Sequence, residues 1–97
     1  MTKLMDEEVR SLLATMHGWR FLGDAIHKEF TFRGFLGAIS FVNRVAELAN
    51  AAAHHPDLEI HYNRVVVSLS THDESGVTDK DVMLARDIDS VGEPEGD

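Results

Sequence analysis

Apolar residues recur at helical spacing in the middle of the chain, over residues 35–53. They stand three or four positions apart and therefore line one face of a helix: Phe35, Ala38, Ile39, Val42, Val45, Ala46, Ala49 and Ala53. A stripe with this period is typical of a helix that packs on a hydrophobic core. We therefore expect the longest helix of the chain here, with slim last turns that leave room for a close neighbour.

Alternating or β-branched stretches predict four strands, at residues 19–22, 26–32, 58–62 and 64–71. Lys28 breaks the otherwise apolar face of the second strand. Gly23-Asp24 is a turn signal between the first two strands. We expect Asn63 to turn the chain between the last two, because asparagine tolerates the positive φ angle that tight hairpins require.

Further helices are expected at both ends of the chain. Thr2 is the expected cap of a first helix, which His17-Gly18 ends. Thr78 is the expected cap of a last helix, with Asp81 three residues on. The order is therefore α-β-β-α-β-β-α. We predict an α+β fold in which a four-stranded antiparallel sheet carries three helices on one face.

The length of 97 residues suits one compact domain. We expect residues 1–90 to form that domain and residues 91–97 to be an acidic, disordered tail. A domain of this size has little core to spare, so we expect self-association.

Charge and composition exclude several classes of function. The chain has 17 acidic and 9 basic residues, a net charge of −8, so it should repel nucleic acid and anionic membranes. It has no cysteine, which excludes disulfides, thiolate zinc sites and cysteine nucleophiles. It shows neither a signal peptide nor a membrane-length apolar run, so we expect a cytoplasmic location.

Histidines 54 and 55 stand at the end of the long predicted helix, directly before Pro56. The proline disfavours helical geometry at His55, so the helix should end there and both rings can approach one pocket. The negative end of the helix dipole favours a protonated imidazole, which is a good general acid near neutral pH. His72 follows the last predicted strand, a common place for chemistry on a rigid scaffold.

Three interpretations of these histidines are open from the residues alone. The side chains can be helix caps or solvated surface groups, they can bind zinc, or they can transfer protons. Adjacent histidines seldom ligate one metal, and the chain has no HxH or HxxxH pair. A GxSxG elbow and glycine-rich phosphate loops are also absent. His17, His27 and His61 receive no role.

A set of residues spread along the chain resembles the pattern of the pterin-4a-carbinolamine dehydratase family: Asn50, His54-His55-Pro56, Tyr62, His72 and Asp81. The contexts DAIHKEFTF, FVNRVA, LSTH and DVMLA are also similar to the family, so the resemblance runs from about Trp19 to Ile88. It implies a four-stranded sheet with helices on one side, and dimers or tetramers. Animal members of the family also act as dimerisation cofactors of a homeodomain transcription factor.

The implied reaction is loss of water from 4a-hydroxytetrahydrobiopterin, giving quinonoid dihydropterin in tetrahydrobiopterin recycling, without metal or cofactor. The resemblance implies a catalytic set of His54, His55 and His72, with His55 acting mainly in substrate binding. The implied pterin pocket comprises His54, His55, Pro56, Thr71, His72, Asp73 and Glu74. Asp81 is expected near His72, where it can orient the ring.

Two positions depart from the family pattern. Many members carry a carboxylate at the position of Asn50, and some carry an aromatic residue at that of Leu58. Residues 50 and 54 should share a helix face, so Asn50 is expected to orient His54 through its amide oxygen without adding charge. The alternative function is a non-catalytic interaction or assembly protein that retains the dehydratase fold. A metal-dependent hydrolase is a third possibility.

Overall fold

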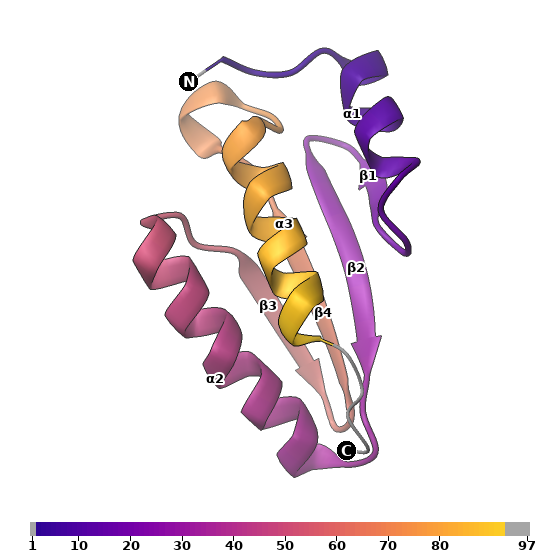
Figure 1. Ribbon diagram of the computed structural model, residues 1–97, viewed down its shortest axis with the longest axis vertical. Coiled ribbons are helices and arrows are strands. Elements are labelled where there is room, and N and C mark those ends of the chain that lie inside the picture. Colours follow the sequence, from indigo (N-terminus) through magenta and orange to yellow (C-terminus); the bar gives the residue numbers. More distant parts are fainter. Residues whose placement is uncertain (1, 93–97) are drawn as a thin grey trace.

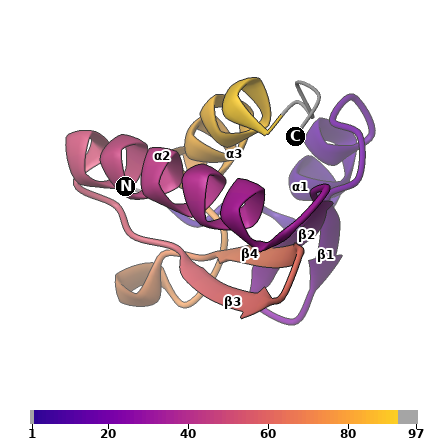
Figure 2. The same cartoon turned by 90° about the horizontal axis from the view of Figure 1, so that it is seen from below.

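A computed structural model describes residues 2–92 and shows one antiparallel sheet in the strand order β1-β2-β4-β3. Within that part of the chain the strands are β1 (Arg20–Leu22), β2 (Ala25–Thr31), β3 (Asp57–His61) and β4 (Arg64–Leu69). The helices are α1 (Asp6–Leu13), α2 (Phe35–Ala52) and α3 (Asp79–Val91), with a short 3-10 helix, η1 (His72–Glu74), after β4. The helices lie on one side of the sheet (Figures 1 and 2). The predicted α+β fold and element order are confirmed.

The core lies between the helices and the central strands β2 and β4. Across these strands Ile26 pairs with Leu69, and Phe30 pairs with Val65. Phe41 of α2 packs on Phe30, with 4.6 Å between the ring centroids. All of these side chains are buried, so the alternation in the sequence reports which face of each strand meets the helices. None of the described helices is both long and apolar enough to cross a membrane.

Lys28, which interrupts the apolar alternation of β2, lies on the helix-covered face. Its Nζ is 2.7 Å from Asp89 Oδ1 in α3, and it lies 4.8 Å from the centroid of the Phe30 ring. The Trp19 indole N–H donates to the same carboxylate, at 3.0 and 3.1 Å from its two oxygens. Because each polar group has a partner, the lysine ties α3 to the sheet instead of disrupting the core.

The first helix begins later than expected. Met5 rather than Thr2 is the N-cap of α1, so the prediction for Thr2 is wrong. The Leu4 N–H donates to the Val77 carbonyl at 2.8 Å, and this contact holds the N-terminal segment beside the chain that leads into α3. A contact between segments so far apart in sequence carries no local signal, which is why capping propensity alone misplaced the helix start.

The last helix begins as expected and ends later. Thr78 is the N-cap of α3, and Asp81 completes a capping box with it. The helix runs to Val91, so the first residue of the expected tail is helical. Residues 93–97 of that tail lie outside the described part of the chain.

The turn between β3 and β4 differs from the expectation in one detail. The positive φ angle, 54°, falls on Tyr62 and not on Asn63. Asn63 instead bonds to Phe32, the residue after β2: its side-chain amide donates to the Phe32 carbonyl at 2.9 Å, and its own carbonyl accepts from the Phe32 N–H at 2.8 Å. Asparagine at this position therefore fastens the hairpin to the neighbouring strand.

The end of α2 sets the direction of the two adjacent histidines. Ala53 adopts a left-handed conformation, with φ 53° and ψ 39°. Its N–H donates to the Asn50 carbonyl at 3.2 Å, and the His54 N–H donates to the Ala49 carbonyl at 3.1 Å. These are the two hydrogen bonds of a Schellman motif. The helix thus ends at Ala52, before the expected end at His55, and both histidines follow the reversal of the chain.

Ala53→Gly should stabilise the fold. A left-handed conformation costs a residue with a Cβ about 1–2 kcal/mol, most of which glycine avoids. Allowing for the greater freedom of glycine in the unfolded chain, we expect the free energy of unfolding to rise by about 0.5–1 kcal/mol in urea denaturation. Ala51→Gly, inside the same helix, is the control and should lower it by about 1 kcal/mol. Equal destabilisation by both variants would contradict the strain at Ala53.

Candidate active site

The three histidines singled out in the sequence line one cavity of about 290 Å³. Its lining residues come from the end of α2, the loop after β4 and the start of α3. Figure 1 shows these segments toward the same end of the molecule. The residues that line it are Ala53, His54, His55, Ser70, Thr71, His72, Asp73 and Lys80. The cavity thus gathers imidazoles from two segments that are separated in the sequence by the β3–β4 hairpin.

His72 is held on a short closed loop. The Thr71 N–H donates to the Gly76 carbonyl at 2.8 Å, and the two residues form an isolated antiparallel bridge. Ser75 reverses the chain with a φ of 54°, and its N–H donates to the His72 carbonyl at 3.1 Å. This loop replaces the last two residues of the expected strand, so β4 ends at Leu69.

Asp81 joins the three segments that form the cavity. Its carboxylate is fully buried, at 0% exposure, in the first turn of α3. Oδ1 accepts a hydrogen bond from His54 Nε2 at 2.5 Å. Oδ2 accepts from the Thr71 hydroxyl at 2.8 Å and from the Thr78 N–H at 2.9 Å. One carboxylate therefore ties the end of α2 to the loop after β4 and to the cap of α3.

This contact determines how His54 can exchange protons. An ionised carboxylate only accepts hydrogen bonds, so the hydrogen of a neutral His54 is on Nε2. Nδ1 has no hydrogen-bond partner among the described residues and is left for a ligand. A buried carboxylate behind an imidazole fixes its tautomer and orientation, as in enzymes that use histidine as a base. No group of three or more His, Asp or Glu among residues 2–92 is arranged to hold a metal ion.

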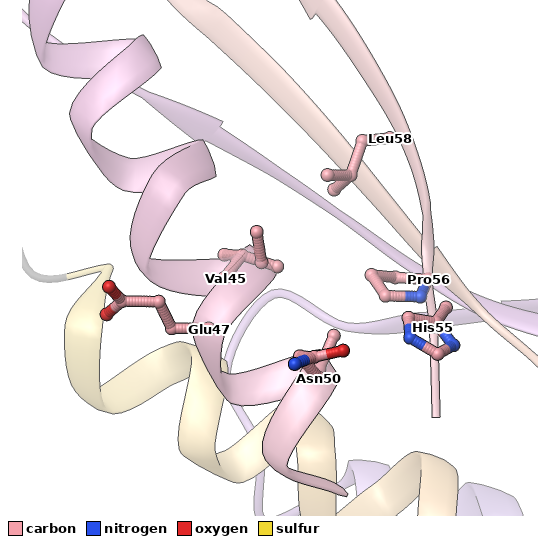
Figure 3. Close-up of a pocket in the computed structure, with 8 residues that line it drawn as sticks. Val45, Glu47, Asn50, His55, Pro56 and Leu58 are labelled. Atoms are coloured by element: carbon pink, nitrogen blue, oxygen red, sulfur yellow. The ribbon is translucent and has the colours of Figure 1, made fainter. Parts of the chain in front are cut away.

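Two expected contacts within the site are wrong. Asp81 bonds to His54 and not to His72, because the first turn of α3 faces the end of α2. Asn50 is not among the hydrogen-bond partners of His54 in the described chain, because the left-handed residue between them breaks the i, i+4 relationship. Asn50 instead extends from α2 toward His55 (Figure 3).

Most of the expected pocket residues lie in the cavity wall: His54, His55, Thr71, His72 and Asp73. Pro56 lines a neighbouring hollow, and Glu74 lies in the lining of neither. Sequence reasoning missed Ala53, Ser70 and Lys80. Ser70 stands two residues before His72, so the two share one face of an extended chain, and this was a signal for Ser70. Lys80 could be found only by knowing that the start of α3 faces the histidines.

The neighbouring hollow is larger, at about 500 Å³, and lies between α2 and β3. Its lining comprises Val45, Ala46, Glu47, Ala49, Asn50, His55, Pro56 and Leu58. His55 lines both cavities, so they adjoin one another. Figure 3 shows Glu47 pointing away from the strand side of this hollow. The two departures from the family pattern, Asn50 and Leu58, both fall here.

Comparison with protein families agrees with the motif. The family model for pterin 4 alpha carbinolamine dehydratase matches residues 2–91. The chain belongs to the pterin-4a-carbinolamine dehydratase family. The family recognised from the sequence is therefore confirmed, and its members are hydro-lyases.

Relatives that match the chain over most of its length have names that place them in this family. A protein of Thermosynechococcus vestitus is 46% identical and covers 92% of this chain and 94% of its own. One of Thermomicrobium roseum is 48% identical, with coverages of 91% and 95%.

Solved structures agree in fold. A transcriptional coactivator/pterin dehydratase from Brucella melitensis superposes with a TM-score of 0.90 at 34% identity, covering 94% of this chain and 99% of that one. A pterin dehydratase-like RuBisCO assembly factor of the alpha-carboxysome gives a TM-score of 0.68 at 18% identity, with coverages of 82% and 95%. The second likeness shows a shared fold alone.

Asp81→Ala should strongly destabilise the protein. The change leaves the buried Thr78 N–H and the Thr71 hydroxyl without this acceptor, at about 1–3 kcal/mol for each unsatisfied group. We expect the free energy of unfolding in urea to fall by about 2–4 kcal/mol. Asp79→Ala, an exposed acid of the same turn, is the matched control and should cost less than about 1 kcal/mol. A loss at Asp81 no larger than the loss at Asp79 would show that the carboxylate does not hold the segments together.

Proposed function

We propose that this protein dehydrates 4a-hydroxytetrahydropterins, such as 4a-hydroxytetrahydrobiopterin, to quinonoid dihydropterins. The observation that carries the proposal is the lining of one cavity by His54, His55 and His72, with Asp81 behind the first of them. Membership of the dehydratase family supports the same reaction. We propose further that it acts in the cytoplasm as a homodimer or homotetramer.

The proposed reaction is a matter of proton transfers. The bond between C4a and its hydroxyl oxygen breaks, and the hydroxyl leaves as water after receiving a proton from an acid. The lone pair of N5 forms a double bond to C4a, and the ring gives up one N–H proton to a base. Two imidazoles on either side of a flat ring can supply both steps by general acid–base catalysis.

The contacts of each imidazole suggest its role. His54 is the proposed base, because Asp81 holds its Nε2–H and leaves Nδ1 to receive the ring proton. His72 is the proposed acid, since its side chain is exposed at the cavity wall and can reach the leaving hydroxyl. His55, Thr71 and Asp73 are proposed to bind the pterin.

Two further residues complete the proposed binding set. Pro56 lies at the boundary with the larger hollow, where it would limit how deeply the ring can enter. Glu74 follows Asp73 in η1 and remains a predicted pterin-binding residue.

His54→Ala and His72→Ala should each lower turnover by about 100-fold or more, the usual contribution of a positioned acid or base. Stopped-flow absorbance with freshly prepared 4a-hydroxytetrahydropterin measures the rate against buffer. His61→Ala is the control, because His61 lies on β3 with Glu59 as its hydrogen-bond partner, away from the cavity. A wild-type rate no better than buffer would instead favour a non-catalytic protein that keeps the fold.

Asp81→Asn tests whether Asp81 acts through His54. The substitution preserves the shape of the side chain but removes the charge that fixes the imidazole, so we expect turnover to fall about tenfold or more. In the His54→Ala background the same change should have almost no further effect on kcat, because residues that act as a unit are not additive. Additive losses in the double variant would assign Asp81 a purely structural role.

A further inference from the structure

The position of the reacting carbon constrains where the rest of a pterin lies. The substituent of a pterin is attached at C6, which only N5 separates from C4a. If C4a reacts between His54 and His72, the substituent starts beside the same two rings. It must therefore leave the histidine cavity near its wall, either into solvent or into the adjoining hollow.

The sizes of the two cavities favour the hollow. The histidine cavity has about 290 Å³, at the lower limit of the roughly 300–1,000 Å³ usual for ligand pockets. The hollow between α2 and β3 has about 500 Å³ and shares His55 with it. A ring in the first cavity thus has its nearest large space across the His55 side chain.

We propose that this hollow is the subsite for the C6 substituent and that it selects neutral, largely apolar substituents over anionic ones. The inference rests on the proposed function. It names a second part of the site, which His55 shares with the histidine cavity and which His54, His72 and Asp81 do not line.

The lining of the hollow gives the selectivity. Val45 and Ala49 are almost fully buried, at 0% and 2% exposure, and form its floor together with Leu58. No lysine or arginine is among the described residues that line it. An anionic group there would lose hydration without gaining a cation. An apolar group would bury its surface at no such cost.

Asn50 supplies the one neutral polar side chain on the helix wall. Its amide extends toward His55 at the junction of the two cavities (Figure 3). A hydroxyl or amine close to C6 would meet this amide before the substituent enters the apolar part. The cation of the site, Lys80, lies in the other cavity, so an anionic group would be drawn away from the hollow.

Binding of stable dihydropterins tests the subsite without requiring catalysis. The probes are 7,8-dihydropterins with a methyl, phenyl or carboxylate group at C6, titrated by pterin fluorescence. The wild type should bind the phenyl compound about tenfold or more tightly than the methyl compound, as expected for added apolar contact in a pocket. The carboxylate compound should bind most weakly.

Ala46→Phe should remove that preference. Ala46 is an exposed residue of α2 that lines the hollow, and a phenyl side chain there would fill it. We expect the affinity ratio of phenyl to methyl to fall about tenfold or more. Ala51→Phe, an exposed position on the same helix that lines neither cavity, should leave the ratio unchanged. Ala46→Leu provides the same test if the larger side chain prevents folding.

Several results would overturn the subsite. They are equal binding of the methyl and phenyl compounds by the wild type, an unchanged ratio in Ala46→Phe, and tighter binding of the carboxylate. Loss of self-association in Ala46→Phe with an unchanged ratio would assign the hollow to a second copy of the chain.

These titrations, combined with the stopped-flow assay of dehydration, distinguish a failure of the subsite from a failure of the proposed function. A wild type that discriminates among the three pterins but does not dehydrate the carbinolamine would contradict only the function. A wild type that dehydrates the carbinolamine but binds the three pterins equally well would contradict only the subsite. A protein that binds none of the three would overturn both.

Discussion

The buried carboxylate of Asp81 is the contact on which both the fold and the site depend. A charge at 0% exposure is tolerable only when hydrogen-bonded. Its oxygens receive a histidine N–H from the end of α2, a hydroxyl from the loop after β4 and the N–H of the α3 cap. The three segments cannot separate without breaking the hydrogen bonds of this carboxylate. The same contacts hold His54 in one orientation, so the stability of this corner and the preorganisation of its imidazole have a common origin.

Two residues with strained backbone stand beside the histidines. Ala53, directly before His54, and Ser75, directly after η1, both have φ angles near 54° although neither is glycine. Left-handed residues persist where surrounding contacts determine the chain path, and they gather at functional sites. Here each reverses the chain beside a histidine. The reversal at Ala53 also separates the two neighbouring rings: His54 meets Asp81, whereas His55 becomes the wall between two cavities.

Local patterns were enough to predict the three α-helices and the four strands, because period and capping act over a few residues, but they did not predict η1. The error at the start of α1 came from a contact between distant segments, because the bond to Val77 holds the chain near Thr2 extended. The partner of Lys28 in the predicted second strand, Asp89, is equally distant in sequence. The site shows the same limit. The family motif identified the histidines, but the partner of Asp81 depends on how α3 packs against the end of α2. The helical spacing of Asn50 and His54 did not bring the two side chains together, because Ala53 between them is left-handed. An alanine in the sequence gives no signal of that conformation.

The arrangement separates the proposed chemistry from the proposed selectivity. The proton-transfer groups stand on element ends that a buried carboxylate fixes, and substitution there affects folding and reactivity together. Apart from its buried floor, the hollow is bounded by exposed or half-buried side chains of α2 and β3, such as Ala46 and Leu58. Changes at such positions are usually small in stability. Substitutions in the hollow between α2 and β3 can therefore change which C6 substituent the domain accepts, while the network around Asp81 stays intact.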